Sequence, residues 1–263
     1  MELIRRAGNR GKFYPRDCKE ITFQIEQFNK ITTIDEPLTV HPRAIIAPHA
    51  GYIYSGFTAN AAHAMLAKTQ PKRVIVIGPS HHVYFEGVSA AFFQQYETPC
   101  GNLQIDLNYL EKLSHTFNFL FNKRAHDVEH STETQMPFIR HYHPEASVVE
   151  LIYGNIEWQQ IALVIEAVLS DKENAIVISS DLSHFYPLEQ AVQLDGICME
   201  AIKQKDVNLL DAGCEACGIV GIKAMIDVAS RQNLRTHILD YRTSADASGD
   251  SSSVVGYVSA VIG

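Results

Sequence analysis

The sequence predicts an α/β fold in which a central, largely parallel or mixed sheet carries helices on both faces. Apolar runs of strand length alternate along the chain with segments of helical periodicity. The interior runs are apolar at consecutive positions, which is typical of parallel strands buried on both faces. The 263 residues, 46% hydrophobic and 20% charged, are enough for one large domain or two small ones, and length alone does not decide.

The first four predicted elements alternate between helix and strand. Residues 18–30 (CKEITFQIEQFNK) carry apolar side chains at helical spacing and predict an amphipathic helix. The short apolar run at 43–48 (RAIIAP) predicts a buried strand. Residues 55–68 begin with Ser55 and are rich in helix formers, so they predict a helix, and residues 73–80 (RVIVIGPS) predict the next strand.

The middle of the chain continues with a strand at 87–93 and a helix at 107–117. Residues 131–143 predict a further helix with a cap-like start, because a carboxylate follows Ser131 closely. Pro137 lies inside this segment, and we expect it to kink the helix or to limit it to a short one.

The C-terminal half keeps the same alternation of apolar runs and periodic segments. Its predicted strands are 146–154, 174–181, 235–244 and 253–262, and its predicted helices are 157–171, 188–204 and 218–232. The Ser/Asp/Gly stretch at 243–253 is a flexible connection or, alternatively, a loop that lines a site.

The composition excludes several classes of partner. The net charge is −8, whereas nucleic-acid and anionic-membrane surfaces need clustered Lys and Arg. No apolar run approaches the roughly 20 residues that span a bilayer. The first segment, MELIRRAGNRGKFYP, has no apolar core of signal-peptide type. We therefore predict a cytoplasmic protein that binds neither nucleic acid nor membrane.

Three predicted strands, AIIAP, VIVIGPS and AIVISS, end in unusual polar residues. At these ends stand His49, the pair His81 and His82, and Asp181 with His184. Ligands in parallel α/β sheets bind outside the carboxyl ends of the strands. If these strands are parallel neighbours, the polar groups share one edge of the sheet and form a candidate site.

The residue types at this edge suit a metal ion. Imidazole is a common ligand of zinc, copper, iron and nickel, and two histidines with one carboxylate are typical of non-haem Fe(II) oxygen chemistry. Asp181 supplies that carboxylate, or it orients a histidine from outside the ligand shell. Neighbours in an extended chain point to opposite sides, so His81 and His82 are not expected to bind one ion.

The cysteines give a weaker signal. An odd number, five, without a signal segment predicts free thiols in a reducing compartment, most of them small buried hydrophobic residues. Cys214 and Cys217 form a C-x-x-C at the start of a predicted helix, where the helix N-terminus favours thiolate. The pair is a redox disulfide, half of a zinc site or an accidental spacing, or else Cys217 alone joins the two histidines. The case for structural zinc is weak, because the second cysteine pair of an all-thiolate site is missing.

Six stretches follow one another in order over nearly the whole chain. They are GKFYP (11–15), APHAGYIYSG (47–56), GPSHH (78–82), EHSTETQMPF (129–138), SSDLSHF (179–185) and ACGIVGI (216–222). Together they resemble the Memo family, named for mediator of ErbB2-driven cell motility. This family is related in fold to the class III extradiol dioxygenases, which cleave catechol rings with Fe(II). The resemblance implies one domain of that α/β fold over residues 1–263.

The resemblance also supplies a ligand set. It implies that His49, His81 and Cys217 correspond to the metal ligands, and that Asp181 and His184 correspond to the polar pair beside the metal. True extradiol enzymes use two histidines and a glutamate, and a thiolate in the third position favours softer metals. We therefore expect iron or copper. A second departure is the N-terminal RRAGNRG, where the family usually has an apolar PAVAG-like stretch.

The remaining roles are assigned to residues beside these ligands. We expect His184 to act as an acid or base, with a pKa open to tuning near neutrality, and Asp181 to hold His184 or a bound water. The candidate pocket-lining residues are Tyr52, Tyr54, Glu129 and His130.

Two functions follow from this site. The first is a metal-dependent redox or oxygenase-type enzyme that acts on oxygen or on a small aromatic or phenolic molecule. The second is a non-catalytic protein that binds a small or peptide ligand in the dioxygenase cleft. The resemblance further implies phosphotyrosine signalling and copper-dependent redox in eukaryotic relatives. In prokaryotes it implies association with a radical S-adenosylmethionine protein. The cleft shows no evident Arg cluster, which counts against a phosphopeptide ligand.

Overall fold

The structure, a computed structural model, describes residues 3–31 and 40–263. Its helices are α1 (Cys18–Ile31), α2 (Tyr52–Leu66), α3 (Leu107–Phe117), α4 (Lys123–Val128), α5 (Met136–Tyr142), α6 (Trp158–Leu169), α7 (Leu188–Gln204), α8 (Val207–Leu210), α9 (Ile219–Arg231) and α10 (Ala245–Ser248). Its strands are β1 (Ile4–Arg5), β2 (Ala44–Ala47), β3 (Arg73–Pro79), β4 (Val88–Ala90), β5 (Gln95–Tyr96), β6 (Leu103–Gln104), β7 (Ser147–Tyr153), β8 (Asn174–Ser179), β9 (His184–Tyr186), β10 (Thr236–Thr243) and β11 (Val254–Ile262).

The main sheet has the strand order β10-β11-β2-β8-β3-β7-β4, and β9 pairs with β11 off this path. Its centre is parallel, because β2, β8, β3 and β7 all run in the same direction. The outer strands β4, β11 and β10 are antiparallel to their neighbours. This mixed sheet with a parallel centre confirms the predicted fold class, and β2, β8 and β3 are neighbours, as the candidate site requires.

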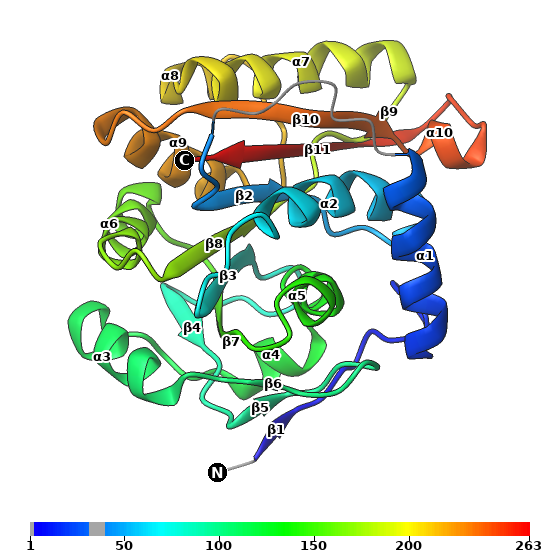
Figure 1. Ribbon diagram of the computed structural model, residues 1–263. Coiled ribbons are helices and arrows are strands. Elements are labelled where there is room, and N and C mark those ends of the chain that lie inside the picture. The colour runs from blue at the N-terminus through cyan, green and yellow to red at the C-terminus, as the bar shows by residue number, and fades with distance from the viewer. Residues whose placement is uncertain (1–2, 32–39) are drawn as a thin grey trace.

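Helices cover both faces of the sheet (Figure 1). α6 and α9 pack together against β8, whereas α2 packs against β2, β10 and β11 and is itself covered by α1 and α5. The central strands are buried along nearly their whole length. Burial on both faces explains why their sequences are apolar at consecutive positions.

The segment after Ser131 differs from its prediction. Ser131 does not cap a helix, because its hydroxyl donates to the carbonyl of Pro79 at 2.7 Å. A 3-10 turn at Glu133–Gln135 comes first, and Pro137 then lies in the first turn of α5. Proline is tolerated there because the first N–H groups of a helix have no partner in the helix. Pro137 therefore lies where the short helix α5 begins and does not kink it.

A second, small sheet was not predicted. It joins β1, β5 and β6, each of two residues, and these are too short to leave a periodic pattern. The stretch 243–253, predicted as a loop, contains the short helix α10, and the Asp246 carboxylate accepts from the backbone N–H of Thr243 at 2.8 Å.

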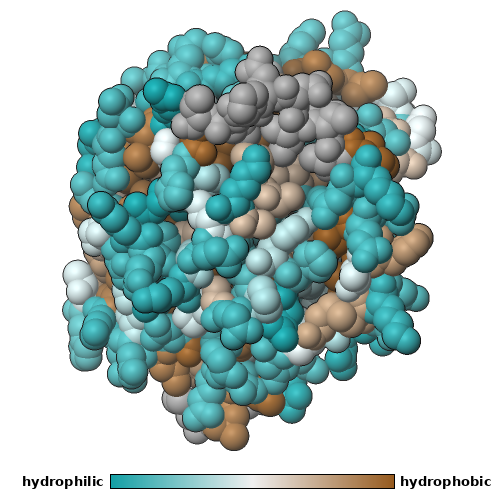
Figure 2. Space-filling model, viewed as in Figure 1, coloured by the Kyte–Doolittle hydropathy of each residue, from teal (hydrophilic) through white to brown (hydrophobic). Residues whose placement is uncertain are grey.

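Figure 2 shows a surface that is mostly hydrophilic on the face viewed, with scattered apolar residues. Among the described residues, no helix combines the length and the apolarity that crossing a lipid bilayer requires.

The expectation of five free thiols is wrong for four of the cysteines. Cys18 is bonded to Cys100 and Cys198 to Cys214, with Cα–Cα distances of 4.8 and 4.9 Å. Cys217 is the free cysteine of the part of the chain that the structure describes. Sequence spacing does not reveal such pairs, because the fold brings together residues that are 82 and 16 positions apart. The C-x-x-C is therefore not a disulfide of its own.

This pairing predicts the alkylation pattern of the protein. Chain purified and denatured without reductant should take up one alkyl group, on Cys217, and five after reduction. Peptide mapping by mass spectrometry reads both the number and the position. A label on Cys214 before reduction would contradict the pairing.

Candidate functional site

The predicted strand tips meet at one edge of the sheet. β8 lies between β2 and β3, so the ends of these three strands deliver Asp181, His49 and His81 side by side. Cys217 reaches the same edge because the backbone at the start of α9 passes close to the end of β8. A Cβ on Gly218 would lie 2.6 Å from the Cβ of Ser180, so only glycine lets the start of α9 approach the end of β8 this closely.

Three imidazoles gather at this edge. The ring centroids of His49 and His81 are 5.1 Å apart, those of His81 and His130 are 4.7 Å apart, and those of His49 and His130 are 5.4 Å apart. One ligand nitrogen from each ring lies within 4.8 Å of the others. Three neutral imidazoles in this arrangement can hold a metal ion.

Glu129 orients His81. Its carboxylate accepts from Nδ1 of His81 at 2.8 Å and from the backbone N–H of His81 at 2.6 Å. Nε2 of His81 is then the nitrogen left for a ligand, an arrangement common in metal sites. Burial alone would raise the pKa of Glu129, but His81 and the N–H of Ser131 hold it at about 2.

A second group of candidate donors, His82, Glu129 and His130, also lies within 4.8 Å. The Glu129 oxygens already accept from His81 twice and from the N–H groups of His130 and Ser131. A carboxylate has about four lone-pair positions. The histidine cluster of His49, His81 and His130 is therefore the better metal site.

Cys217 lies against the same cluster. Its Sγ is 3.3 Å from Nε2 of His49 and accepts from the backbone N–H of Asp181 at 3.3 Å. Two ligands at bond lengths of about 2.0 and 2.3 Å on a tetrahedral ion stand about 3.5 Å apart. The separation of Sγ and Nε2 therefore fits two ligands of one ion. Among the described residues, however, the donors that lie within 4.8 Å of both His49 and His81 include His130 and not Cys217.

The thiol of Cys217 is not activated by the helix that follows. Burial raises its pKa to about 12, and the nearby Asp181 adds to the effect. The helix N-terminus was expected to lower this pKa, but desolvation of the buried thiol raises it by more. A metal ion that binds here must displace the thiol proton.

Asp181 and His184 lie beside the cluster. The buried carboxylate of Asp181 accepts from the backbone N–H of His49 at 2.7 Å, and burial raises its pKa to about 7. His184 is half-buried, and burial lowers its pKa. Its loop is held by Asp195 of α7, which accepts from the N–H of Ser183 at 2.9 Å.

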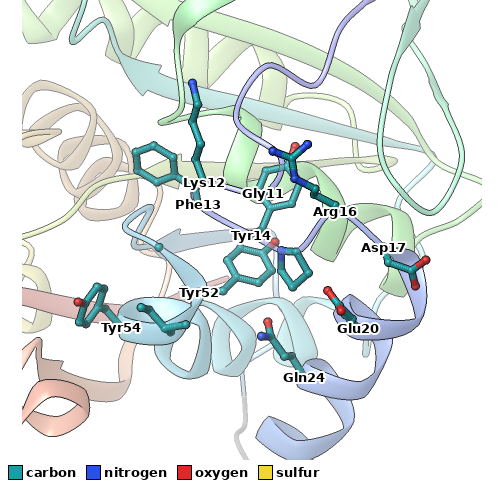
Figure 3. Close-up of a pocket in the computed structure, with 13 residues that line it drawn as sticks. Gly11, Lys12, Phe13, Tyr14, Arg16, Asp17, Glu20, Gln24, Tyr52 and Tyr54 are labelled. Atoms are coloured by element: carbon teal, nitrogen blue, oxygen red, sulfur yellow. The ribbon is translucent and has the colours of Figure 1, made fainter.

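A cavity of about 670 Å3 lies between the segment before α1 and the start of α2 (Figure 3). Tyr52 and Tyr54 line it, as the sequence predicts, together with Phe13 and Tyr14. Phe13 also stacks on His130, with ring centroids 4.4 Å apart and an interplanar angle of 25°. Phe13 therefore connects an aromatic cavity of ligand size with the cluster.

A buried ion pair holds the segment that carries Glu129 and His130. Arg5 Nη1 donates to the Glu133 carboxylate at 2.6 Å, and its Nη2 donates to the carbonyl of Glu129 at 3.0 Å. Both charged side chains are fully buried. The N-terminal segment that carries Arg5 thus contributes to the site.

His130 was expected to line the pocket, and the structure adds it to the cluster of donors. Its Nδ1 is buried without a hydrogen-bond partner among the described residues. The sequence carried one signal: the EHS motif places an acid and an imidazole together. It did not show that this loop reaches the strand tips.

Comparison with known proteins shows the family to which this chain belongs. The model of the family described as Memo-like protein matches residues 5–261. A MEMO1 family protein of Methanobrevibacter smithii is 31% identical over 98% of this chain and 99% of its own length. MEMO1 family proteins of Aquifex aeolicus and Metallosphaera sedula are 30% and 31% identical, each over 97% of this chain and over 97% and 98% of their own lengths.

Proposed function

Because this chain belongs to the Memo-like family, we propose that it binds one iron or copper ion through His49, His81 and Cys217 and uses it in redox or oxygenase-type catalysis. The single observation that supports this most is the position of His49. Its Nε2 lies 3.3 Å from the thiol of Cys217, and its ring faces those of His81 and His130. His130 adds a nitrogen donor on the side of the cavity.

The donor set fits such an ion. Two imidazoles and a soft thiolate suit copper, iron and zinc better than magnesium or calcium. An iron or copper ion, when bound, supplies electron transfer and access to oxygen chemistry. The chain supplies the surroundings: Glu129 orients His81, and Asp181 holds the backbone of His49.

The half-buried His184 is the proposed acid or base for the substrate proton. Burial favours its neutral form, which can accept a proton at neutral pH. The substrate class we propose is a small aromatic or phenolic molecule, because four aromatic residues line the cavity beside His130: Phe13, Tyr14, Tyr52 and Tyr54. Association with a radical S-adenosylmethionine protein remains part of the proposal.

A second candidate function is supported by the same cavity. At about 670 Å3 it is large enough to hold a small ligand or the side chains of a peptide without any reaction. In this case the ion is structural or absent, and the chain is a binding protein.

One experiment separates the two functions. The chain is purified anaerobically, its metal content is measured, and oxygen consumption is recorded over a panel of catechols. The enzyme predicts about one iron or copper per chain and oxygen uptake that is lost in Cys217→Ser. A parent protein that stays free of metal under every loading condition would support the binding protein.

A further inference from the structure

The two ring nitrogens of His49 contact different residues. Nε2 faces the thiol of Cys217 at 3.3 Å, and Nδ1 lies 3.0 Å from the hydroxyl of Ser179 at the end of β8. Only 2% of the surface of His49 is exposed. A neutral imidazole carries one proton, so the hydrogen bond at Nδ1 decides whether Nε2 offers a lone pair.

The partners of Ser179 decide the direction of that hydrogen bond. Its Oγ lies 2.5 Å from the carbonyl oxygen of Ser131, 2.8 Å from Nε2 of Gln135 and 3.0 Å from Nδ1 of His49. A hydroxyl has one proton and two lone pairs. The carbonyl of Ser131 can only accept and the amide nitrogen of Gln135 can only donate. The hydroxyl of Ser179 therefore donates its one proton to the carbonyl of Ser131 and accepts from Gln135. The remaining lone pair must accept from His49, and Nδ1 therefore carries the ring proton.

The orientation of the Gln135 amide is fixed independently. Its Nε2 also donates to the carbonyl oxygen of Pro48 at 2.9 Å, and its Oε1 lies 2.8 Å from Nε2 of His63. A flipped amide would turn an acceptor toward the Pro48 carbonyl, which is itself only an acceptor. Gln135, Ser179 and His63 are fully buried, so water does not compete for these bonds.

We propose that Ser179 is a positioning residue that holds His49 as the Nδ1–H tautomer, and that Gln135 and the Ser131 carbonyl fix the direction of the Ser179 hydroxyl. The Nε2 lone pair of His49 then faces the cluster before any ion arrives. The role toward the ion rests on the proposed function, whereas the tautomer itself does not.

The two histidine ligands are oriented by different kinds of hydrogen-bond acceptor. His81 donates to a carboxylate, that of Glu129, and His49 donates to a neutral hydroxyl. A carboxylate partner raises the basicity of a ligating imidazole. Both histidines therefore present Nε2, but a charged partner fixes the ring of His81 and a neutral partner fixes that of His49.

The tautomer is measured first on the metal-free protein. Two-dimensional 15N NMR of the histidine rings should show Nδ1 of His49 protonated and Nε2 unprotonated in the parent. Ser179→Ala removes the acceptor, and Nε2–H of His49 can then donate to the sulfur of Cys217, so the tautomer should reverse. The matched control is Ser259→Ala, because Ser259 is also fully buried but its Oγ has no partner among the described residues. A parent ring protonated at Nε2, or an unchanged tautomer in Ser179→Ala, overturns the proposal.

Metal affinity is measured second, with Co(II) as the probe and a competing chelator. Loss of an orienting partner typically costs roughly 10–100-fold in metal affinity, and we expect a loss in this range for Ser179→Ala. Gln135→Leu should weaken binding less, because Ser131 still accepts from Ser179. Its control is Asn60→Leu, which removes a buried amide bonded to Asn29 and Tyr142 but remote from the cluster.

The NMR measurement and the affinity measurement test different parts of the proposal, so each part can be contradicted without the other. A parent that binds no Co(II) contradicts the proposed function, while the NMR result still decides the tautomer. Equal affinities for Ser179→Ala and Ser259→Ala, with Co(II) bound tightly by both, contradict the positioning role. If Ser179→Ala does not fold, the tautomer in the parent and the comparison of Gln135→Leu with Asn60→Leu decide the question.

Discussion

His49→Ala is expected to abolish stoichiometric metal binding while the chain remains folded. His49 lies close to each of the other candidate ligands, since it contacts Cys217, His81 and His130. The affinity loss should exceed the roughly 100-fold that removal of an orienting partner costs, because a ligand itself is lost. Metal content after gel filtration and a Co(II) titration measure the effect.

His82→Ala is the matched control for this prediction. His82 is exposed and adjacent to His81, and it lies in the other group of candidate donors. The affinity of this variant should stay close to that of the parent. If His82→Ala loses metal and His49→Ala keeps it, the ion belongs with His82, Glu129 and His130.

Glu133→Ala is expected to give the largest loss of stability. Glu133 is fully buried, pairs with Arg5 at 2.6 Å and accepts from the N–H of Asn9 at 2.6 Å and from the hydroxyl of Tyr14 at 2.7 Å. Removing one partner of a buried ion pair typically costs about 3–5 kcal/mol, because the other charge stays buried with less compensation. Here Arg5 keeps Glu150, at 3.8 Å, as its remaining carboxylate partner. Urea unfolding gives the free energy of unfolding directly.

The control is an ion pair at the surface. Glu166 lies 3.0 Å from Arg231, and both side chains are more than 40% exposed. Glu166→Ala should change the free energy of unfolding by less than about 1 kcal/mol. Similar values for Glu133→Ala and Glu166→Ala would show that the buried network does not hold the segment of Glu129 and His130.

The ends of helices α3 and α7 were predicted to the residue. The strands of the main sheet were predicted within a few residues, except β9, which was not predicted. Their signals are local: apolar periodicity for the helices, and consecutive apolar residues for strands covered on both faces. The small sheet of β1, β5 and β6 was missed because its two-residue strands are defined by pairing between distant segments. The pairing of Cys198 with Cys214 was missed for the same reason.

The edge of the sheet with His49, His81 and Asp181 could be predicted because parallel strands end at one side. The choice of Cys217 came from family resemblance, and the structure explains its proximity through the close approach at Gly218. The place of His130 could not be predicted, because a buried ion pair with the N-terminal segment positions its loop. The sequence also did not show that burial raises the pKa of the Cys217 thiol more than the helix N-terminus lowers it.

The central claim is that distant parts of the chain converge on one ion, and an anomalous difference map from a crystal of the metal-loaded protein tests it most directly. The account predicts a single peak within bonding distance of Nε2 of His49, Nε2 of His81 and Sγ of Cys217. A crystal that takes up metal but shows no peak there, or shows it between His82 and Glu129, would contradict it.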